Sequence, residues 1–401
     1  MLSKKVGSVN KELVELTKRF IAVPGYSELV EKETKMAETL YKELRSMGLP
    51  AQLLDYDGRY NVVCEYEGEQ IGPTVVLCTH LDTVPPYEMQ NPFEGKVENG
   101  RLYGRGAVDV RGILAAMSLV MKRLFEEKAE ICGKVRFLAV SDEESGSYGM
   151  RKEIENGYYA DLTIVGEPTE LQLGIAHKGV TWIQVDFRGK TAHGSVPEEG
   201  HNAIYDANHF IQYIVEDLIP KLKDRKQHKL LGTASINVGL IDGGTRPTIV
   251  PEFCRVQIDR RLVPDEDIVQ VLNEITEEAG KVNDGKADFE IKAILGDEEH
   301  PFPPLDSGRY QSILTCLSQT VSKITGSQKN IIGLPYWTDA ALPGYYTGKA
   351  AVVIGPGNIA QAHSNNEYID ISQLEQSVEV YDSMVRAISE LYRKEGENAF
   401  K

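Results

Sequence analysis

The order of strand-like and helix-like segments limits the possible folds of this chain more than any other feature. Helical patterns around residues 9–22 and 27–47 precede the strand-like segments "NVVCEYEG" and "TVVLCTH", and a helical pattern at 111–127 precedes "KVRFLAVSDEE" and "LTIVGEP". Alternation of this kind predicts an α/β domain with a mainly parallel sheet and helices on both faces.

The pattern changes near residue 177. From there to 296 the sequence reads strand, helix, strand, strand, helix, strand, which is the β-α-β-β-α-β order of a ferredoxin-like α+β domain. Beyond 300 the α/β pattern resumes, and 401 residues are enough for two domains. We therefore expect a discontinuous α/β domain, residues 1–176 and 297–401, with an inserted α+β domain, residues 177–296.

Composition excludes several classes of protein. A formal net charge of −16 argues against a nucleic-acid partner, which requires a basic surface. The longest apolar run, "ILAAMSLVM", is too short to span a membrane, and the first residues do not form a signal peptide. Five scattered cysteines in mostly apolar surroundings predict reduced core thiols. We expect a cytoplasmic protein that does not bind a membrane.

Side chains that can bind metal ions follow several predicted strands. Because ligands bind at the carboxyl ends of strands in open α/β sheets, we expect these side chains to converge. Each alone is more often a polar loop cap or a solvated acidic turn. Together, their nitrogen and oxygen atoms suit zinc or, less selectively, cobalt or manganese, and their number suits two ions that share a carboxylate. The set comprises His80 and Asp82, Glu143 and Glu144, Glu167, His363 and, in a Gly-rich loop that enters a helix, Asp109.

Several ordered motifs give this constellation a family context. "THLDTVP", "GRGAVDVRG", "DEESGSYG", "VGEPT" and "GPGNIAQAHSNNEYI" resemble the co-catalytic zinc hydrolases that include acetylornithine deacetylase, succinyl-diaminopimelate desuccinylase, aminoacylase and carboxypeptidase G. The similarity covers nearly the whole chain. The resemblance implies two zinc ions, one bound by His80 and Glu167 and the other by Glu144 and His363, with Asp109 as the bridge, Asp82 orienting His80 and Glu143 as the general base.

The resemblance also extends to the inserted domain, which would be a lid and a dimerisation domain. His193 in "GKTAHGSVPEEGHNAI" would donate to the oxyanion from the partner chain of a homodimer, although alone it would be an ordinary surface histidine. Arg261 in "DRRLVP" would hold a substrate carboxylate, unless it pairs with a neighbouring acid. Thr248 in "TIVP" stands where relatives often have asparagine, so we expect a changed substrate pocket. The other histidines, His177, His201, His209, His228 and His300, are assigned structural or surface roles.

These features predict a metal-dependent amidohydrolase. Its substrate would be a small N-acyl amino acid or a short peptide, with N-acetylornithine as the leading candidate. An aminoacylase, a succinyl-diaminopimelate desuccinylase and a dipeptidase or carboxypeptidase are alternatives within the family. A metal-binding protein without catalysis is a more distant alternative, because it would not need Asp82 and Glu143. A nicotinamide dehydrogenase is disfavoured, since no G-x-G-x-x-G follows a strand directly.

Overall fold

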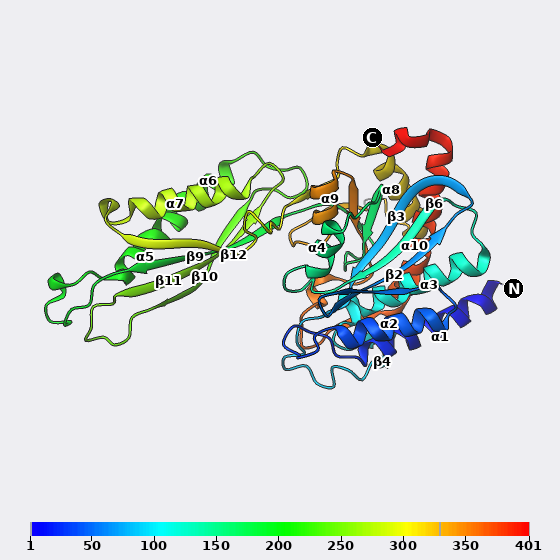
Figure 1. Cartoon of the computed structure of the whole chain (residues 1–401), viewed down its shortest axis with the longest axis horizontal. Helices are drawn as coiled ribbons and strands as arrows, with labels where there is room; N and C mark the ends of the chain where they lie inside the picture. The colour runs from blue at the N-terminus through cyan, green and yellow to red at the C-terminus, as the bar shows by residue number, and fades with distance from the viewer. Residues whose placement is uncertain (1, 329, 401) are drawn as a thin grey trace. The chain divides into compact units, whose positions relative to one another are not determined.

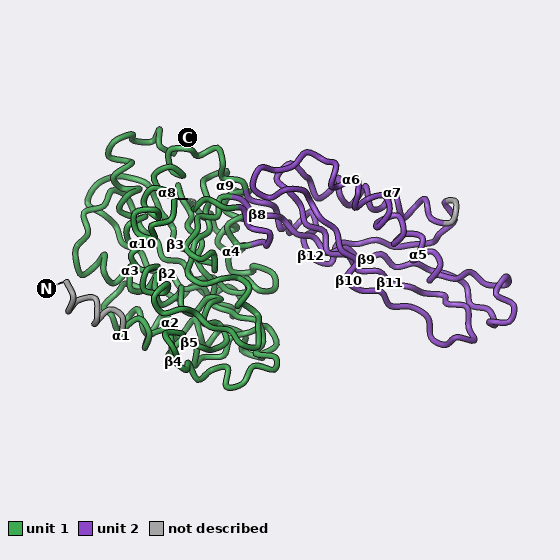
Figure 2. The backbone as a smooth tube through the Cα atoms, turned by 180° about the vertical axis from the view of Figure 1, so that it is seen from behind, with its two compact units in different colours: residues 1–175, 306–332, 338–401 green, residues 176–305, 333–337 purple. Residues whose placement is uncertain are grey.

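The computed structural model of the chain describes residues 2–328 and 330–400 and divides into two compact units (Figures 1 and 2). Unit 1 comprises residues 1–175, 306–332 and 338–401, and unit 2 comprises residues 176–305 and 333–337. This division differs in detail from the expected boundaries, because residues 297–305 and 333–337 are grouped with the inserted segment.

A nine-stranded mixed sheet organises unit 1. Its order is β1-β2-β6-β3-β7-β15-β8-β13, and β14 pairs with β8. The pairs β3–β6, β3–β7 and β7–β15 are parallel, whereas β1–β2, β2–β6 and β15–β8 are antiparallel, so the parallel part is the centre. The strands are β1 (Gln52–Tyr56), β2 (Arg59–Glu67), β3 (Gln70–His80), β6 (Cys132–Val140), β7 (Leu162–Val165), β8 (Leu173–His177), β13 (Leu305–Asp306), β14 (Ile331–Leu334) and β15 (Ala350–Val353).

The parallel centre brings four strand ends to one edge. His80 lies opposite Val140 in the β3–β6 register, and Val165 pairs with both Cys78 of β3 and Val353 of β15. The last six residues of β3 are all buried, as expected for a central strand covered on both faces. The segments that follow β3, β6, β7 and β15 therefore start next to one another.

Helices pack against this sheet and against one another. Helix α3 is apolar almost all round and buried, and it contacts β3 and β6 together with α10. Helix α1 packs on α3, α8 packs on α10, α4 contacts β2 and β6, and α9 contacts β15. A small sheet with the order β16-β5-β4 completes the unit. The bounds are α1 (Leu2–Ile21), α2 (Thr34–Ser46), α3 (Gly112–Glu127), α4 (Tyr148–Glu155), α8 (Gln311–Thr325), α9 (Ala341–Thr347), α10 (Ile371–Glu395), β4 (Lys96–Glu98), β5 (Arg101–Tyr103) and β16 (Tyr368–Asp370).

Unit 2 has the predicted β-α-β-β-α-β order. Its antiparallel sheet has the order β10-β11-β9-β12, which is the ferredoxin-like arrangement. Ile183, Val185 and Phe187 on one face of β9 share a core with Phe210 and Ile275 from two helices. The elements are β9 (Gly179–Arg188), α5 (Ala203–Tyr213), α6 (Ile219–Asp224), β10 (Ser235–Gly243), β11 (Phe253–Leu262), α7 (Ile268–Gly285) and β12 (Asp288–Leu295).

Two composition-based expectations concern the whole chain. Among the described residues, no helix combines the length and the apolar character needed to cross a bilayer. All five cysteines are free thiols, and four of them are buried, as predicted for reduced core residues.

Candidate metal centre

The predicted metal-binding residues meet at the common edge of the parallel strands. His80 is the last residue of β3, Glu143 and Glu144 lie in the turn after β6, and Glu167 follows β7 by two residues. His363 belongs to the segment after β15. Asp109 lies in the turn Ala107–Arg111 that leads into α3.

Asp109 lies between two groups of candidate ligands. Its Oδ1 atom is 3.0 Å from His80 Nε2, and its Oδ2 atom is 3.2 Å from His363 Nε2. His80 Nε2 is also 3.6 Å from Glu167 Oε1, while His363 Nε2 is 3.1 Å from Glu144 Oε1. Each oxygen of Asp109 thus faces its own histidine, and each histidine lies near a different glutamate, as expected around a carboxylate shared by two cations.

The charge of this site suits divalent cations. Two groups of three residues could each hold a cation, because the ligand atoms within each group lie within 4.8 Å of one another. One group is His80, Asp109 and Glu144, and the other is His80, Glu143 and Glu167. The Oε1 atom of buried Glu167 has no hydrogen-bond partner among the described residues. A buried carboxylate oxygen without a partner is costly, and a bound cation removes that cost. The residues therefore fit metal ions.

Proton affinities reflect the same excess of carboxylates. Burial raises the pKa of Glu143, Glu144 and Glu167, and neighbouring carboxylates add to the rise. Hydrogen bonds to Asp109 and Glu144 raise the pKa of His363 to about 11. In the metal-free protein, bound protons thus reduce the repulsion among these carboxylates. A metal ion must displace those protons in order to bind.

Asp82 contacts both His80 and the turn that carries the two glutamates. Its Oδ1 atom is 3.4 Å from His80 Nδ1. The backbone N–H groups of Glu143 and Glu144 donate to its two carboxylate oxygens at 3.1 and 3.0 Å. Burial opposes ionisation of Asp82, but bonds from His80 and these amides lower its pKa. Asp82 therefore lies where an orienting carboxylate is expected, and it also fixes the turn.

Glu367 and Arg105 support Asp109, and the sequence analysis gave them no role. Their side chains are both 1% exposed and lie 2.5 Å apart. Glu367 Oε1 accepts the backbone N–H groups of Val108 and Asp109 at 3.0 and 3.2 Å. Burial, together with Asp109 nearby, raises the pKa of Glu367 to about 7. The only sequence signal for this pair was the position of both residues inside family-like motifs.

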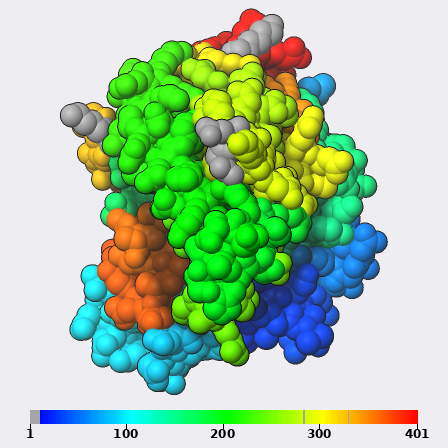
Figure 3. All heavy atoms as spheres, turned by 90° about the vertical axis from the view of Figure 1, so that its left-hand side faces the viewer, coloured from blue at the N-terminus to red at the C-terminus, as the bar shows by residue number. Residues whose placement is uncertain are grey.

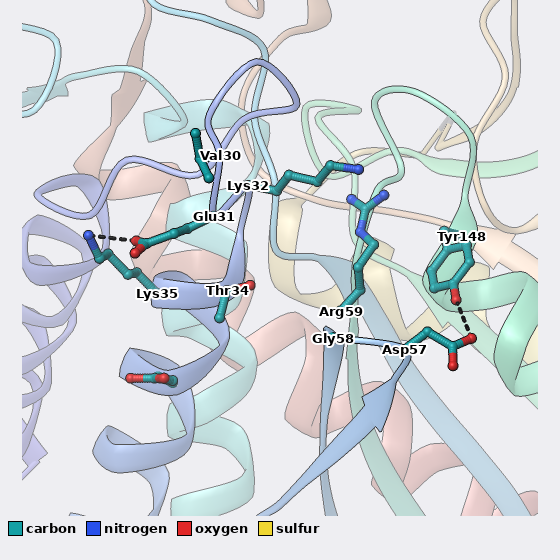
Figure 4. Close-up of a pocket in the computed structure, with 10 residues that line it drawn as sticks. Val30, Glu31, Lys32, Thr34, Lys35, Asp57, Gly58, Arg59 and Tyr148 are labelled. Carbon is teal, nitrogen blue, oxygen red and sulfur yellow. Dashed lines mark hydrogen bonds and ion pairs between the residues drawn. The ribbon is translucent and has the colours of Figure 1, made fainter.

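Arg59 supports the turn that carries the two glutamates. Its guanidinium binds Glu33 through two bonds of 2.9 Å and Asp142 at 2.8 Å. Asp142 has φ +69°, a conformation that needs support in a residue other than glycine. A pocket of about 630 Å³ opens beside this arginine, and Figure 4 shows Lys32 and Arg59 directing their cationic ends toward one another there. The sequence offers no signal for these contacts.

Asp339 is another buried carboxylate of unit 1 that the sequence analysis missed. It is 1% exposed, and neither of its oxygens has a hydrogen-bond partner among the described residues. Burial raises its pKa to about 6, although the Ser147 hydroxyl lies close enough to oppose the rise. The charge of Asp339 in turn contributes to the raised pKa values of Glu143 and Glu167.

Three predicted site residues belong to unit 2. His193 Nδ1 lies 2.7 Å from Ser195 Oγ, and the ring is exposed. The Thr248 carbonyl accepts the N–H of Gly194 at 2.8 Å, so Thr248 lies beside the His193 segment. The Arg261 guanidinium pairs with Asp259 at 2.9 Å and stays partly exposed.

The fold and the two groups of ligands around Asp109 define a metal-dependent hydrolase of amide bonds. A sequence model of Peptidase family M20/M25/M40 matches residues 76–387, and the chain belongs to this family. This confirms the resemblance inferred from the motifs.

Known proteins similar to this chain include both deacylases and peptidases. A peptidase M20 domain-containing protein of Schizosaccharomyces pombe is 28% identical over 94% of this chain and 83% of its own length. An acetylornithine deacetylase of Proteus mirabilis is 26% identical over 93% of this chain and 95% of its own. Among solved structures, an M20 family metallo-carboxypeptidase of Sulfolobus solfataricus has a TM-score of 0.79 at 22% identity and covers 94% of this chain and 99% of its own. That structural likeness shows the fold.

Proposed function

We propose that this enzyme hydrolyses the amide of an N-acyl amino acid, with an acetylornithine deacetylase-like activity as the first candidate. The observation that carries the proposal is the arrangement around Asp109: its two oxygens face separate histidines, and each histidine lies near a different glutamate. The similarity to the Proteus mirabilis acetylornithine deacetylase supports the choice of substrate. Aminoacylase, succinyl-diaminopimelate desuccinylase and di- or carboxypeptidase activities are the alternatives within the family.

The ligand groups suit two zinc ions per chain, with cobalt or manganese as substitutes. His80 and Glu167 would hold one ion, Glu144 and His363 the other, and Asp109 both. Divalent ions at this place polarise an amide carbonyl and make water more acidic.

Glu143 is the proposed general base. Asp82 anchors its backbone N–H at 3.1 Å, so the glutamate is held in a fixed turn. Burial and the neighbouring carboxylates raise the pKa of Glu143 in the metal-free site. Bound cations would oppose that rise, and the carboxylate would then accept a proton from the attacking water and deliver it to the leaving amine. Glu143 also belongs to one possible ligand group with His80 and Glu167, so its variant must be tested for metal content as well as for turnover.

Residues of unit 2 would complete the reaction. His193 is proposed to donate a hydrogen bond to the oxyanion that develops on the amide carbonyl. Arg261 is proposed to bind the α-carboxylate, with Asp259 holding the guanidinium in place. Thr248 would shape the substrate pocket.

We further propose a cytoplasmic homodimer that forms through unit 2. Strand β10 is the edge of the four-stranded sheet, and it exposes Leu240 and Ile241 at 64% and 55%. An exposed apolar edge strand can pair with a twin from a second chain. In such a dimer, His193 of one chain would serve the active site of its partner. The five free thiols favour a reducing compartment.

The function is tested by metal analysis combined with a panel of N-acyl amino acids and dipeptides, with and without chelator. Glu143→Gln should keep fold and metal but lose turnover by at least about 10²-fold, because general-base catalysis contributes 10² to 10⁴. Normal turnover of this variant would place the base elsewhere. Mixing it with His193→Ala chains should restore partial activity. If chains exchange and activity does not return, delivery of His193 from the partner is wrong.

A further inference from the structure

Unit 2 contains a pocket of about 560 Å³ between two chain segments, residues 194–205 and 243–251. Figure 3 shows the surface of this unit, where the chain runs from green to yellow. The lining combines apolar residues, among them Ile204 and Ile249, with the polar residues Asn202, Thr245 and Arg246, and the pocket is open to solvent. Apolar walls with a few placed polar groups are typical of a site for a small molecule.

Arg246 is the single charged residue among those that line this pocket. No acidic side chain lines it, although the chain as a whole carries 60 aspartates and glutamates against 44 lysines and arginines. Arg246 is exposed to solvent, and it can attract an anion because no acidic residue of the lining balances its charge.

Arg246 differs from the other arginines of unit 2 because it has no acidic partner among the described residues. The five other arginines of this unit each pair with a carboxylate, whereas no hydrogen bond or ion pair joins the Arg246 guanidinium to a described residue. Its five N–H donors remain available for an external group. The paired arginines are Arg188, Arg225, Arg255, Arg260 and Arg261.

Further donors face the same space. Asn202 Oδ1 accepts the backbone N–H of Ile204 at 3.0 Å, which leaves the side-chain NH₂ group without a partner among the described residues. The Thr245 hydroxyl, beside Arg246, has no hydrogen bond to a described residue either. The chemistry is therefore that of a carboxylate site: one guanidinium fork and neutral donors.

The pocket adjoins the His193 segment. His193 pairs with Ile249 across an isolated bridge, and the Val250 N–H donates to the Ala192 carbonyl at 2.9 Å. Gly194 and Ile249 line the pocket directly. A substrate whose amide reaches His193 can therefore extend another of its groups to Arg246.

We propose that Arg246 binds a second carboxylate of the substrate, in addition to the α-carboxylate, so that the enzyme prefers N-acyl amino acids with two negative charges. This inference rests on the proposed role of His193. The second carboxylate comes either from an acidic side chain or from a dicarboxylic acyl group such as succinyl. N-acetylornithine has one carboxylate and an ammonium, so in either case it is a poorer substrate. The inference therefore favours an acidic amino acid or a succinyl group over the first candidate of the proposed function.

Matched substrate pairs distinguish the two sources. N-acetylglutamate is compared with N-acetylglutamine, and N-succinylalanine with its terminal amide, with the zinc-loaded full-length protein. We expect the acid to exceed its amide in kcat/KM by roughly 10- to 100-fold in one of the pairs, because a charge-assisted bidentate bond is lost in the amide. Arg246→Gln should bring that ratio close to one, and Arg246→Lys should restore part of it. Arg188→Gln is the matched control and should keep the ratio, since Arg188 pairs with Glu290 outside the pocket.

Two results overturn the inference. Either both acid-to-amide ratios are near one in the unmodified enzyme, or Arg246→Gln leaves the larger ratio unchanged. If neither these compounds nor N-acetylornithine is hydrolysed, the proposed function fails. Binding measurements then test the Arg246 pocket separately. Calorimetry with zinc-loaded Glu143→Gln protein should then show the same preference for the acid, and the added Arg246→Gln change should abolish it. Equal affinity for acid and amide there contradicts the pocket assignment.

Discussion

Replacing Asp339 with asparagine should stabilise the metal-free protein at neutral pH. The carboxylate is 1% exposed and lacks a hydrogen-bond partner among the described residues, and burial raises its pKa from 3.8 to about 6. At about 1.36 kcal/mol per pKa unit, this rise corresponds to about 3 kcal/mol. At neutral pH the ionised carboxylate thus destabilises the folded protein relative to the unfolded chain, and asparagine removes the charge at nearly constant volume.

The raised pKa of Asp339 makes the stability of the folded protein depend on pH in a defined direction. Between pH 3.8 and about 6 the folded protein holds a proton on Asp339 that the unfolded chain has released. This contribution to stability therefore falls as the pH rises through that window, and the loss persists above it. Asp339→Asn should lack this fall. Since 1 kcal/mol shifts the Tm of a large domain by about 2–4 °C, we expect the variant to melt roughly 6–12 °C above the unmodified chelator-treated protein at pH 8.

Differential scanning calorimetry from pH 4 to pH 8 measures this difference. Asp186→Asn is the matched control, because bonds from Arg255 at 2.7 and 2.8 Å lower the pKa of Asp186. That substitution should destabilise the protein at pH 8, with the opposite sign. If Asp339→Asn and the unmodified protein show the same Tm at pH 8, burial does not hold the Asp339 carboxyl in a costly charged state, and the reasoning is wrong.

Three other predictions concern the metal centre. Asp109→Ala should strip both ions, as measured by elemental analysis, because both groups of ligands share this residue; normal metal content would contradict a bridging role. Glu367→Gln keeps an acceptor for the backbone N–H groups but leaves buried Arg105 without a counter-charge. Zinc affinity should therefore drop about 10- to 100-fold. Unchanged affinity would show that Asp109 does not depend on this pair. Zinc affinity should rise with pH, because the ion must displace the proton from His363, whose pKa is raised to about 11 by bonds to Asp109 and Glu144. Calorimetry in buffers of different ionisation enthalpy measures the released protons, and a pH-independent affinity without proton release would refute this.

The positions of the predicted ligands at one sheet edge were readable from the sequence because each residue is tied to a local pattern. A buried strand that ends at His80, and others that end shortly before Glu143 and Glu167, place side chains at strand ends without any knowledge of the full fold. Parallel pairing then brings these ends together, as the register of His80 opposite Val140 shows. The β-α-β-β-α-β order of unit 2 was readable for the same reason, because it follows from the period and sequence of the elements alone.

Contacts between residues distant in the sequence were not readable. Glu367 and Arg105 are separated by 262 residues, and Arg59 and Glu33 by 26. No periodicity predicts which acid meets which arginine across such distances, since the pairing depends on how β16 and the turn before α3 pack. Glu367 lies in the motif "GPGNIAQAHSNNEYI", from which only His363 was predicted to have a role. Its place in that motif was the sole sequence signal for Glu367. The boundaries of unit 2 have the same origin, because residues 333–337 join it through tertiary contacts.

The arginines near this sheet edge explain why some of its carboxylates remain free to bind metal. Buried Arg105 neutralises Glu367, and partly buried Arg59 neutralises Glu33 and Asp142, none of which is a proposed ligand. Arg111 is buried and binds backbone carbonyls instead of a carboxylate. Among the described residues, the proposed ligand carboxylates form ion pairs only with the two histidines, as the contacts of Asp109, Glu144 and Glu167 show. An arginine paired directly with these acids would compete with a cation for the same oxygens. Because the arginines pair with the supporting acids instead, the centre is held in place and stays negative enough to attract divalent ions.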